Sequence, residues 1–382
     1  MEKEIKNKFI GAFNKEPLMV SAPGRINIIG EHTDYNMGFV LPAAIDKHIV
    51  FAIAENGSQM HRLISYDLND EIDVPANSIE KTEKHWANYL VGVIAQIQKM
   101  GKTLSGVDCV FGGNIPLGAG LSSSAALETG FAFALNEVFN LGLSKIEIVK
   151  LSQMAEHEYA GVKCGIMDQF ASVFSEQDKV IKLDCRSLEY KLYPFKLDGY
   201  DIILCDTQVK HSLASSEYNT RRHECESGVA ILQKYNPKIQ SLRDVSPELL
   251  YQHKSEFNPT VYKRCKFVVE EIKRLTDACE ALERNDLATV GKLMYSTHYG
   301  LRDEYEVSCS ELDILVDIAE KSGAVIGSRV MGGGFGGCTI NIVDKTKTNE
   351  FIDIATKGYK AQTGLDLLVY NVSIKQGTSI IN

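Results

Sequence analysis

Apolar and polar positions along the chain follow two patterns, one typical of strands and the other of helices. Met19–Val20 begin an extended run that Pro23–Gly24 break, so Arg25 is predicted to lie where the chain turns. A second extended run, Val107–Phe111, leads through glycines to a helical pattern over Ala125–Phe139. The first half therefore contains strands and helices that are joined by glycine-rich segments.

Longer helical patterns alternate with short strands in the second half. We predict helices over Ser215–Tyr235, Tyr262–Arg284, Leu287–Tyr299 and Cys309–Lys321, and strands over Asp201–Cys205 and Cys338–Val343. Strands and helices that mix without strict alternation indicate an α+β fold. The pattern changes most clearly between Tyr190 and Tyr200, so we predict two domains, residues 1–195 and 196–382.

The segment from Ser21 to Asn36, SAPGRINIIGEHTDYN, concentrates polar chemistry in a short stretch. Glu31, His32 and Asp34 follow Gly30 on a predicted loop, close to the permanently charged Arg25. Clustered acceptors and an imidazole suit the hydroxyls of a small polyhydroxylated molecule. Taken alone, such a cluster is equally typical of a surface network of arginine and carboxylates.

The segment GGNIPLGAGLSSSAALE, from Gly112 to Glu128, places a glycine loop and serines between a strand and a helix. Backbone N–H groups at a helix N-terminus are unpaired and carry partial positive charge, so this order predicts a phosphate site. It is not a Walker A loop, because Leu121 follows Gly120 and no lysine comes after it. A serine-capped helix after a glycine turn is the alternative.

A third segment, VMGGGFGGC from Val330 to Cys338, is glycine at every position from 332 to 337 except Phe335. Such density predicts positive φ angles or close approach of another backbone. A flexible hairpin tip is the alternative. The GxGxxG spacing of Gly332, Gly334 and Gly337 does not indicate a dinucleotide site, because a strand follows where that site needs a helix.

Together, the three segments resemble the GHMP small-molecule kinases in order and spacing, and the first resembles the signature of galactokinases. Further segments with the same resemblance are WANY (86–89), CGIMDQFAS (164–172), DCRSLEY (184–190), HSLASSEYNTRR (211–222) and RDEYEVSCSELD (302–313). The resemblance extends over nearly the whole chain. It implies two α+β domains with the active site in the cleft between them, and phosphorylation of galactose by ATP.

Composition agrees with this reading. The chain has 382 residues, of which 44% are hydrophobic and 24% charged, as in a soluble protein with two cores. A net charge of −9 argues against nucleic acid or an anionic membrane as partner. No signal peptide or membrane-length apolar run is present, and the nine cysteines read as reduced thiols. We expect a cytoplasmic monomer that acts on small molecules.

The resemblance assigns the catalytic residues. Asp168, in GIMDQF, matches the carboxylate beside the anomeric hydroxyl of the sugar, and Arg25 would lie near Asp168 and the γ-phosphate. Asp168 would accept the proton during phosphoryl transfer, since an ordinary aspartate is too weak a base to remove it beforehand. The sequence does not rank this role against charge stabilisation by Arg25.

The resemblance also assigns the binding residues. The substrate-binding set is Glu31, His32, Asp34, Gly165 and Tyr218, and the ATP-binding set is Gly118, Ala119, Gly120, Leu121, Ser122, Ser123, Ser124, Trp86 and Tyr89. Mg²⁺ would be held by Ser124 and Glu156, whose oxygens suit a hard cation. Glu156 could instead be one of several solvent-facing carboxylates on its predicted helix, Ile148–Tyr159. Trp86 and Tyr89 share a helix face, where core packing is the alternative to stacking on adenine.

Two other functions fit the same resemblance. Some relatives are sensors that bind galactose and ATP without turnover, but they lack the Ser-Ala pair that Ser124–Ala125 provide here. A GHMP kinase for N-acetylgalactosamine, mevalonate or homoserine is the second alternative. The EHTDY cluster (31–35) favours galactose over mevalonate or homoserine, and the 211–218 region favours it over N-acetylgalactosamine.

Overall fold

The sheet of the first half is six-stranded and mostly antiparallel, in a computed structural model that describes residues 1–77, 80–116, 118–209 and 214–381, with only the backbone of 214–216. Its strand order is β13-β1-β3-β6-β4-β5. The bounds are β13 Ser379–Ile380, β1 Leu18–Asn27, β3 Pro42–Glu55, β6 Val107–Gly113, β4 Met60–Ser65 and β5 Asp70–Pro75. The expected strand at 107–111 is therefore confirmed, with two further residues.

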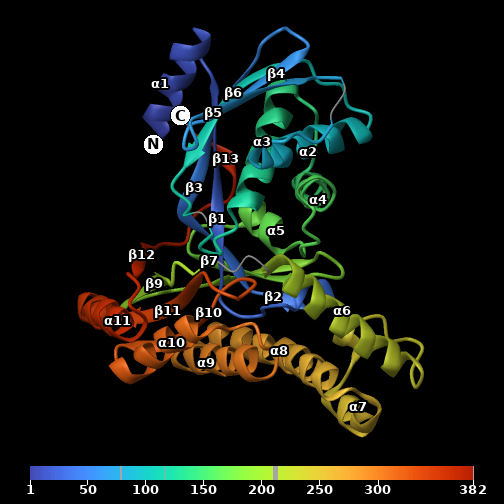
Figure 1. Ribbon diagram of the computed structural model, residues 1–382, viewed down its shortest axis with the longest axis vertical. Helices are drawn as coiled ribbons and strands as arrows, with labels where there is room; N and C mark the ends of the chain where they lie inside the picture. The colour runs from blue at the N-terminus through green and yellow to red at the C-terminus, as the bar shows by residue number, and fades with distance from the viewer. Residues whose placement is uncertain (78–79, 117, 210–213, 382) are drawn as a thin grey trace.

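Helices cover both faces of this sheet (Figure 1). One face packs against α1 Glu2–Phe13, and the other lies under α2 His85–Lys99, α3 Ser123–Phe139, α4 Lys145–Ala155 and α5 Met167–Phe174. Alternation along β3 explains this: Val50 joins the small core with Ile5 of α1, whereas Phe51 joins the main core with Phe131 of α3. Successive strand side chains point to opposite faces, so both faces need a cover.

The second half is built on a four-stranded antiparallel sheet of order β10-β11-β9-β12. Its strands are β10 Val325–Val330, β11 Cys338–Asp344, β9 Tyr200–Asp206 and β12 Leu368–Val372, and its helices are α6 Ala214–Gln233, α7 Pro247–Gln252, α8 Pro259–Glu283, α9 Leu287–Asp303, α10 Ser310–Ser322 and α11 Thr348–Thr363. Helices α9 and α10 pack on β10 (Figure 1). The helices predicted in this half are present within a few residues of their expected ends, and the α+β class is confirmed.

Short elements complete the fold. A small sheet has the order β2-β7-β8, with β2 Phe39–Val40, β7 Lys179–Asp184 and β8 Tyr190–Pro194. Single turns lie at η1 Asp34–Asn36, η2 Glu156–Ala160, η3 Leu242–Asp244, η4 Lys254–Glu256 and η5 Lys345–Lys347. In the described ranges, no helix is both long and apolar enough to cross a membrane.

The two halves share their main core. Phe51 and Phe131 of the first half and Leu204, Met294 and Ile340 of the second belong to one cluster of buried apolar side chains. The last strand, β13, also returns to pair with β1. The division at 195/196 remains a prediction, but the halves are packed together over a common interior.

Two local expectations are wrong. Arg25 does not lie at a turn: β1 continues to Asn27, with only a shift in register between Pro23 and Arg25. Pro23 is tolerated because β13 pairs only with Val20 and Ser21, which leaves that edge of β1 open at the proline. Gly24 is explained by close approach, since a Cβ there would lie 2.5 Å from the carbonyl oxygen of Leu121.

The second wrong expectation concerns the end of α4. The predicted single helix over 148–159 stops at Ala155 and continues as the π-helical turn Glu156–Ala160. The N–H of Gly161 donates to the carbonyl of Glu156 at 2.9 Å, and Gly161 has a φ of 81°. Wide turns of this kind are often found at functional sites.

Candidate active site

Arg25 and Asp168 line a cavity of about 310 Å³, which is called the first cavity below. Arg25 lies on β1, and Asp168 lies in the first turn of α5. Arg25 donates from Nε to Oδ1 of Asp168 at 2.8 Å and from Nη2 to Oδ2 at 2.9 Å, a bidentate pair. Burial lowers the pKa of Arg25, but Asp168 and Glu31 raise it more, so the net shift is upward and the guanidinium stays charged.

Two contacts hold this pair against the loop Gly118–Ser124, called the serine loop below; one is to a backbone carbonyl and the other is from a hydroxyl. Arg25 Nη1 donates to the carbonyl of Gly120 at 2.6 Å, and Ser122 Oγ donates to Oδ2 of Asp168 at 2.5 Å. Ser122 has a φ of 58°, an uncommon value for a residue with a side chain. Ser122 was expected only as part of the phosphate loop, and its contact with Asp168 was not predicted.

The segment from Ser21 to Asn36, called the sugar-type segment below, lines the same cavity and carries groups of different charge. Burial raises the pKa of Glu31, but the guanidinium groups of Arg329 and Arg25 lower it by more than burial raises it. The net shift is downward, so Glu31 is ionised. Burial lowers the pKa of His32 to about 4, so its ring is neutral near pH 7. Burial and the nearby Asp168 raise the pKa of Asp34 to about 7.

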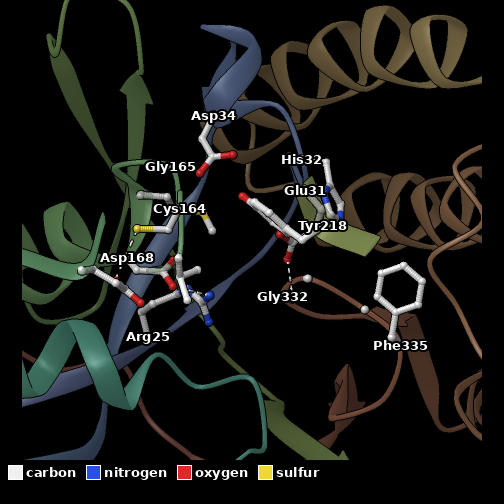
Figure 2. A pocket seen from close by; sticks show the side chains of 15 residues that line it. Arg25, Glu31, His32, Asp34, Cys164, Gly165, Asp168, Tyr218, Gly332 and Phe335 are labelled. Carbon is white, nitrogen blue, oxygen red and sulfur yellow. Dashed lines mark hydrogen bonds and ion pairs between the residues drawn. The ribbon is translucent and has the colours of Figure 1, made fainter. Parts of the chain in front are cut away.

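Gly165 and Tyr218 face these groups from other elements (Figure 2). A Cβ on Gly165 would lie 1.7 Å from Oδ2 of Asp34, so only glycine fits beside that carboxyl group. Tyr218, on α6, packs its ring 5.4 Å from His32 and 5.2 Å from Tyr35, measured between ring centroids. Five residues expected to bind one ligand are thus brought together from three distant segments. Of the 211–222 segment, residues 211–213 lie outside the described residues, and only the backbone of 214–216 is described.

The serine loop and the glycine segment lie against each other. Gly118 and Gly120 have positive φ values of 81° and 75°, and four glycines of the second loop do likewise, Gly332, Gly334, Gly336 and Gly337. A Cβ on Gly337 would lie 3.4 Å from the carbonyl oxygen of Ala119, which confirms the predicted close approach. Ala119 and Leu121 are buried, so only their backbone could meet a ligand.

A second cavity of about 560 Å³ lies beside the start of α3. Trp86, Tyr89, Ser123 and Ser124 are among its lining residues. Trp86 is held by a hydrogen bond from Nε1 to Oδ2 of Asp70 at 2.8 Å. The two aromatic rings are therefore not purely core residues, because both border open space next to the helix N-terminus.

Ser124 and Glu156 meet where the two cavities adjoin. Ser124 lines the second cavity and Glu156 the first, and Ser124 Oγ donates to Oε1 of Glu156 at 3.0 Å. Gln169 Nε2 donates to the other oxygen of Glu156 at 2.7 Å, and burial raises the pKa of Glu156 above its ordinary value. The Ser124 hydroxyl and the buried Glu156 carboxyl are two hard oxygen donors, which are compatible with a divalent cation. Over the described ranges, no three His, Cys, Asp or Glu side chains gather as a metal site by themselves.

Several residues of the site were missed by sequence reasoning. Gln169 and Cys164 contact Glu156, and Arg329 contacts Glu31. Arg329 had a signal in the sequence, because it is the one charged residue of the strand VIGSRV, which leads directly into the glycine segment Gly332–Gly337. For Gln169, the only signal was its position next to Asp168.

Comparisons with known proteins identify relatives of this chain. The galactokinase galactose-binding signature matches residues 7–55, and the N-terminal and C-terminal domains of GHMP kinases match residues 88–176 and 278–361. A galactokinase of Thermotoga maritima is 43% identical over 364 residues, covering 95% of this chain and 100% of the relative. One of Clostridium beijerinckii is 41% identical over 381 residues, covering 98% and 97%.

Solved structures extend the comparison. A crystal structure of Lactococcus lactis galactokinase complexed with galactose superposes with a TM-score of 0.96 and 34% identity, over 99% of both chains. Methanococcus jannaschii mevalonate kinase has a TM-score of 0.67 at 20% identity, covering 94% of this chain and 99% of that one, which shows a common fold only.

Proposed function

Since this chain belongs to the galactokinases, within the GHMP kinases, we propose that it transfers the γ-phosphoryl group of ATP to the anomeric hydroxyl of α-D-galactose. The products are galactose 1-phosphate and ADP. The observation that carries this proposal is the bidentate Arg25–Asp168 pair, which lines the first cavity and also contacts the loop before α3.

The chemistry is assigned to that pair. Asp168 accepts the anomeric proton as the oxygen–phosphorus bond forms, and the bond between the γ-phosphorus and the ADP oxygen breaks. Arg25 holds the Asp168 carboxylate in place and faces the transferring phosphoryl oxygens. Because the transition state is loose, positioning and charge compensation supply much of the acceleration, and the base adds to it.

The sugar is bound by the wall of the first cavity. Glu31 and Asp34 accept hydrogen bonds from hydroxyl groups, and the neutral His32 ring can donate or accept. His32 Nδ1 is hydrogen-bonded to the Tyr35 hydroxyl at 2.8 Å, which orients the ring where it lines the cavity. Tyr218, beside His32, and the backbone of Gly165, beside Asp34, line the same cavity.

The nucleotide is bound by the serine loop and the second cavity. The backbone N–H groups of Gly118 to Ser124 and the hydroxyl of Ser123 meet the phosphates. Trp86 and Tyr89, which line the second cavity, border the base. Mg²⁺ would be held by Ser124 and Glu156, and when bound it neutralises charge on the β- and γ-phosphates. We further propose that the protein is a monomer and acts in the cytoplasm.

An ADP-release assay tests the reaction, with galactose, N-acetylgalactosamine, other hexoses, mevalonate and homoserine as acceptors. Galactose should give turnover well above the others. Binding of galactose and ATP without ADP release would identify a sensor, and faster turnover of N-acetylgalactosamine would identify that kinase instead.

Asp168→Asn tests the assignment of the base. The variant keeps the size of the side chain but loses the charge and the proton acceptor, so kcat should fall about 10²–10⁴-fold. The measurement is turnover, with the product identified by phosphorus NMR and the melting transition checked. The exposed Asp198→Asn serves as control. Retention of more than about a tenth of wild-type kcat would show that Asp168 is not an essential base.

A further inference from the structure

Arg329 is a fully buried charged residue that does not line the first cavity, which the proposed function assigns to the sugar and which is called the sugar cavity below. It lies on β10, next to the end of that strand, three residues before Gly332. Its guanidinium donates from Nε to the carbonyl of Ile28 at 2.8 Å and from Nη2 to the carbonyl of Asn27 at 2.5 Å. It also donates from Nη1 to the carbonyl of Val330 at 2.5 Å. Every nitrogen of the group is therefore used.

The remaining partner of Arg329 is a residue of the sugar cavity. Nη2 donates to Oε1 of Glu31 at 2.9 Å, and the two side chains are 0% and 3% exposed. The backbone N–H of Gly332 donates to the same Oε1, also at 2.9 Å. One carboxylate oxygen thus joins the end of β10, the glycine segment and the sugar-type segment, which is 298 residues away from Arg329 in sequence.

This arrangement leaves the two oxygens of Glu31 with different roles. Within the described part of the chain, the hydrogen bonds of the Glu31 carboxylate fall on Oε1, while the side chain itself lines the cavity. Oε2 is then the acceptor that a bound hydroxyl can reach. The orientation of the carboxylate is set by Arg329 and Gly332, because a charge buried this deeply is stable only with well-placed partners.

Asn27 and Ile28 add a second consequence, because they follow Arg25 on the same stretch of backbone. Through these two carbonyls, Arg329 holds the backbone between Arg25, which pairs with Asp168, and Glu31, which lines the sugar cavity. A planar guanidinium can donate in these several directions at once, whereas a lysine ammonium on a flexible stem cannot reproduce the set.

We propose that Arg329 is a positioning residue for sugar recognition: it directs the open oxygen of Glu31 toward one hydroxyl of the substrate and holds the glycine segment against the sugar-type segment. The proposal deepens the proposed function, since it takes galactose as the ligand. It assigns Arg329 no contact with the substrate and no part in proton transfer.

The test compares Arg329→Lys with Arg264→Lys. Arg264 is a matched control, because it is also buried, bonds two carboxylates, Glu224 and Glu306, and does not line the cavity. Galactose affinity is measured by calorimetry, and kcat and the KM for each substrate by ADP release. Arg329→Lys should weaken galactose binding about tenfold or more, with the KM for ATP changed less than about twofold. Arg264→Lys should leave galactose affinity unchanged.

Deoxygalactoses, each lacking one hydroxyl, give a readout that a merely structural role would not move. The wild-type protein should discriminate against the analogue that lacks the hydroxyl bound by Glu31, and Arg329→Lys should lose that discrimination but keep the others. When Glu31 is already replaced by Gln, adding Arg329→Lys should cause no further change in discrimination among the analogues. Equal weakening for galactose, all analogues and ATP would overturn the proposal, as would unchanged galactose affinity.

The double variant Glu31→Gln with Arg329→Met decides the matter if Arg329→Lys does not fold, because neutralising both partners removes the unpaired buried charge. Its galactose affinity and its discrimination among the deoxygalactoses are compared with those of Glu31→Gln alone: equal values would support a role of Arg329 that acts through Glu31, and a further loss of affinity of about tenfold that is equal for galactose and all analogues would overturn the proposal. Failure of the wild-type protein to bind galactose would instead count against the proposed function.

Discussion

Four carboxyl groups are among the described residues that line the first cavity: Glu31, Asp34, Glu156 and Asp168. Contacts, more than residue type, set their charges. Arginines lower the pKa of Glu31, whereas burial raises the pKa of Asp34 and of Glu156. A site with both ionised and readily protonated carboxyl groups can meet hydroxyls, a cation and phosphates without accumulating four full negative charges.

At this scale, Gly165→Ala should disrupt sugar binding through a single methyl group. The added Cβ would lie 1.7 Å from Oδ2 of Asp34, so the Asp34 side chain or the 161–165 loop must move. We expect the KM for galactose to rise at least about tenfold, as for a lost buried hydrogen bond, while the protein still folds. Steady-state kinetics with galactose varied at saturating ATP measure this. An unchanged KM would separate Gly165 and Asp34 from the sugar site.

Asp34 predicts a dependence of stability on pH. Its folded-state pKa of about 7 lies above the value of an exposed aspartate, so the unfolded chain ionises first as pH rises. Ionisation then favours the unfolded state increasingly up to about pH 7. Asp34→Asn removes this effect, and the variant should gain stability relative to wild type between pH 5 and pH 8 in the absence of ligand.

Urea unfolding at both pH values measures that difference. A constant gap in unfolding free energy between the two proteins would mean that Asp34 has an ordinary pKa.

At the scale of elements, the site is assembled from the ends and irregularities of regular structure. The shift in β1 carries Arg25, the π-helical turn carries Glu156, and the first turns of α3 and α5 carry Ser124 and Asp168. Such positions break the repeating hydrogen bonds of helix or strand, so their side chains can converge on one point.

Glycines in elements away from the site test how backbone conformation affects stability. Gly11 in α1 and Gly323 at the end of α10 are both exposed, and a Cβ would meet nothing within 4 Å at either position. Gly11→Ala should stabilise the protein by about 0.5–1 kcal/mol, because alanine favours the helix. Gly323→Ala should destabilise it by about 1 kcal/mol, because φ is 64° there. Chemical denaturation measures both. Equal signs would show that local φ does not control the effect.

At the scale of the whole molecule, both halves build the first cavity. Arg25 to Asp34 and Glu156 to Asp168 come from the first half, and Tyr218 and Gly332 to Phe335 come from the second. The halves also share the main core and the β1–β13 pairing. A ligand in this cavity should therefore stabilise the two halves together.

Galactose at about 100 times its Kd should raise the free energy of unfolding by about 2.7 kcal/mol, provided that it binds only the folded protein. The shift should appear in one cooperative transition, followed by calorimetry and by tyrosine fluorescence. If two transitions are seen and only one moves, the cavity depends on one half alone, and the division at 195/196 would mark independently unfolding domains.

The amino-acid sequence by itself determined the fold class and the family, and it predicted the residues proposed to carry the chemistry, because these are recorded in short contiguous motifs. EHTDY, LGAGLSSSA and GIMDQF each contain their functional groups within a few positions, and turns, glycines and helix starts follow local rules. The positive φ values of Gly332 and Gly334 could be anticipated for the same reason.

Only the tertiary structure decided how those motifs meet. It placed Arg25 within a strand, turned Glu156 toward Ser124, paired Ser122 with Asp168, and joined Arg329 to Glu31 across 298 residues. Contacts between distant segments depend on which elements pack together, and local patterns of polarity do not specify that partner. A lone arginine in an otherwise uncharged strand indicates a buried counter-charge, but only the folded chain identifies it as the carboxylate of Glu31.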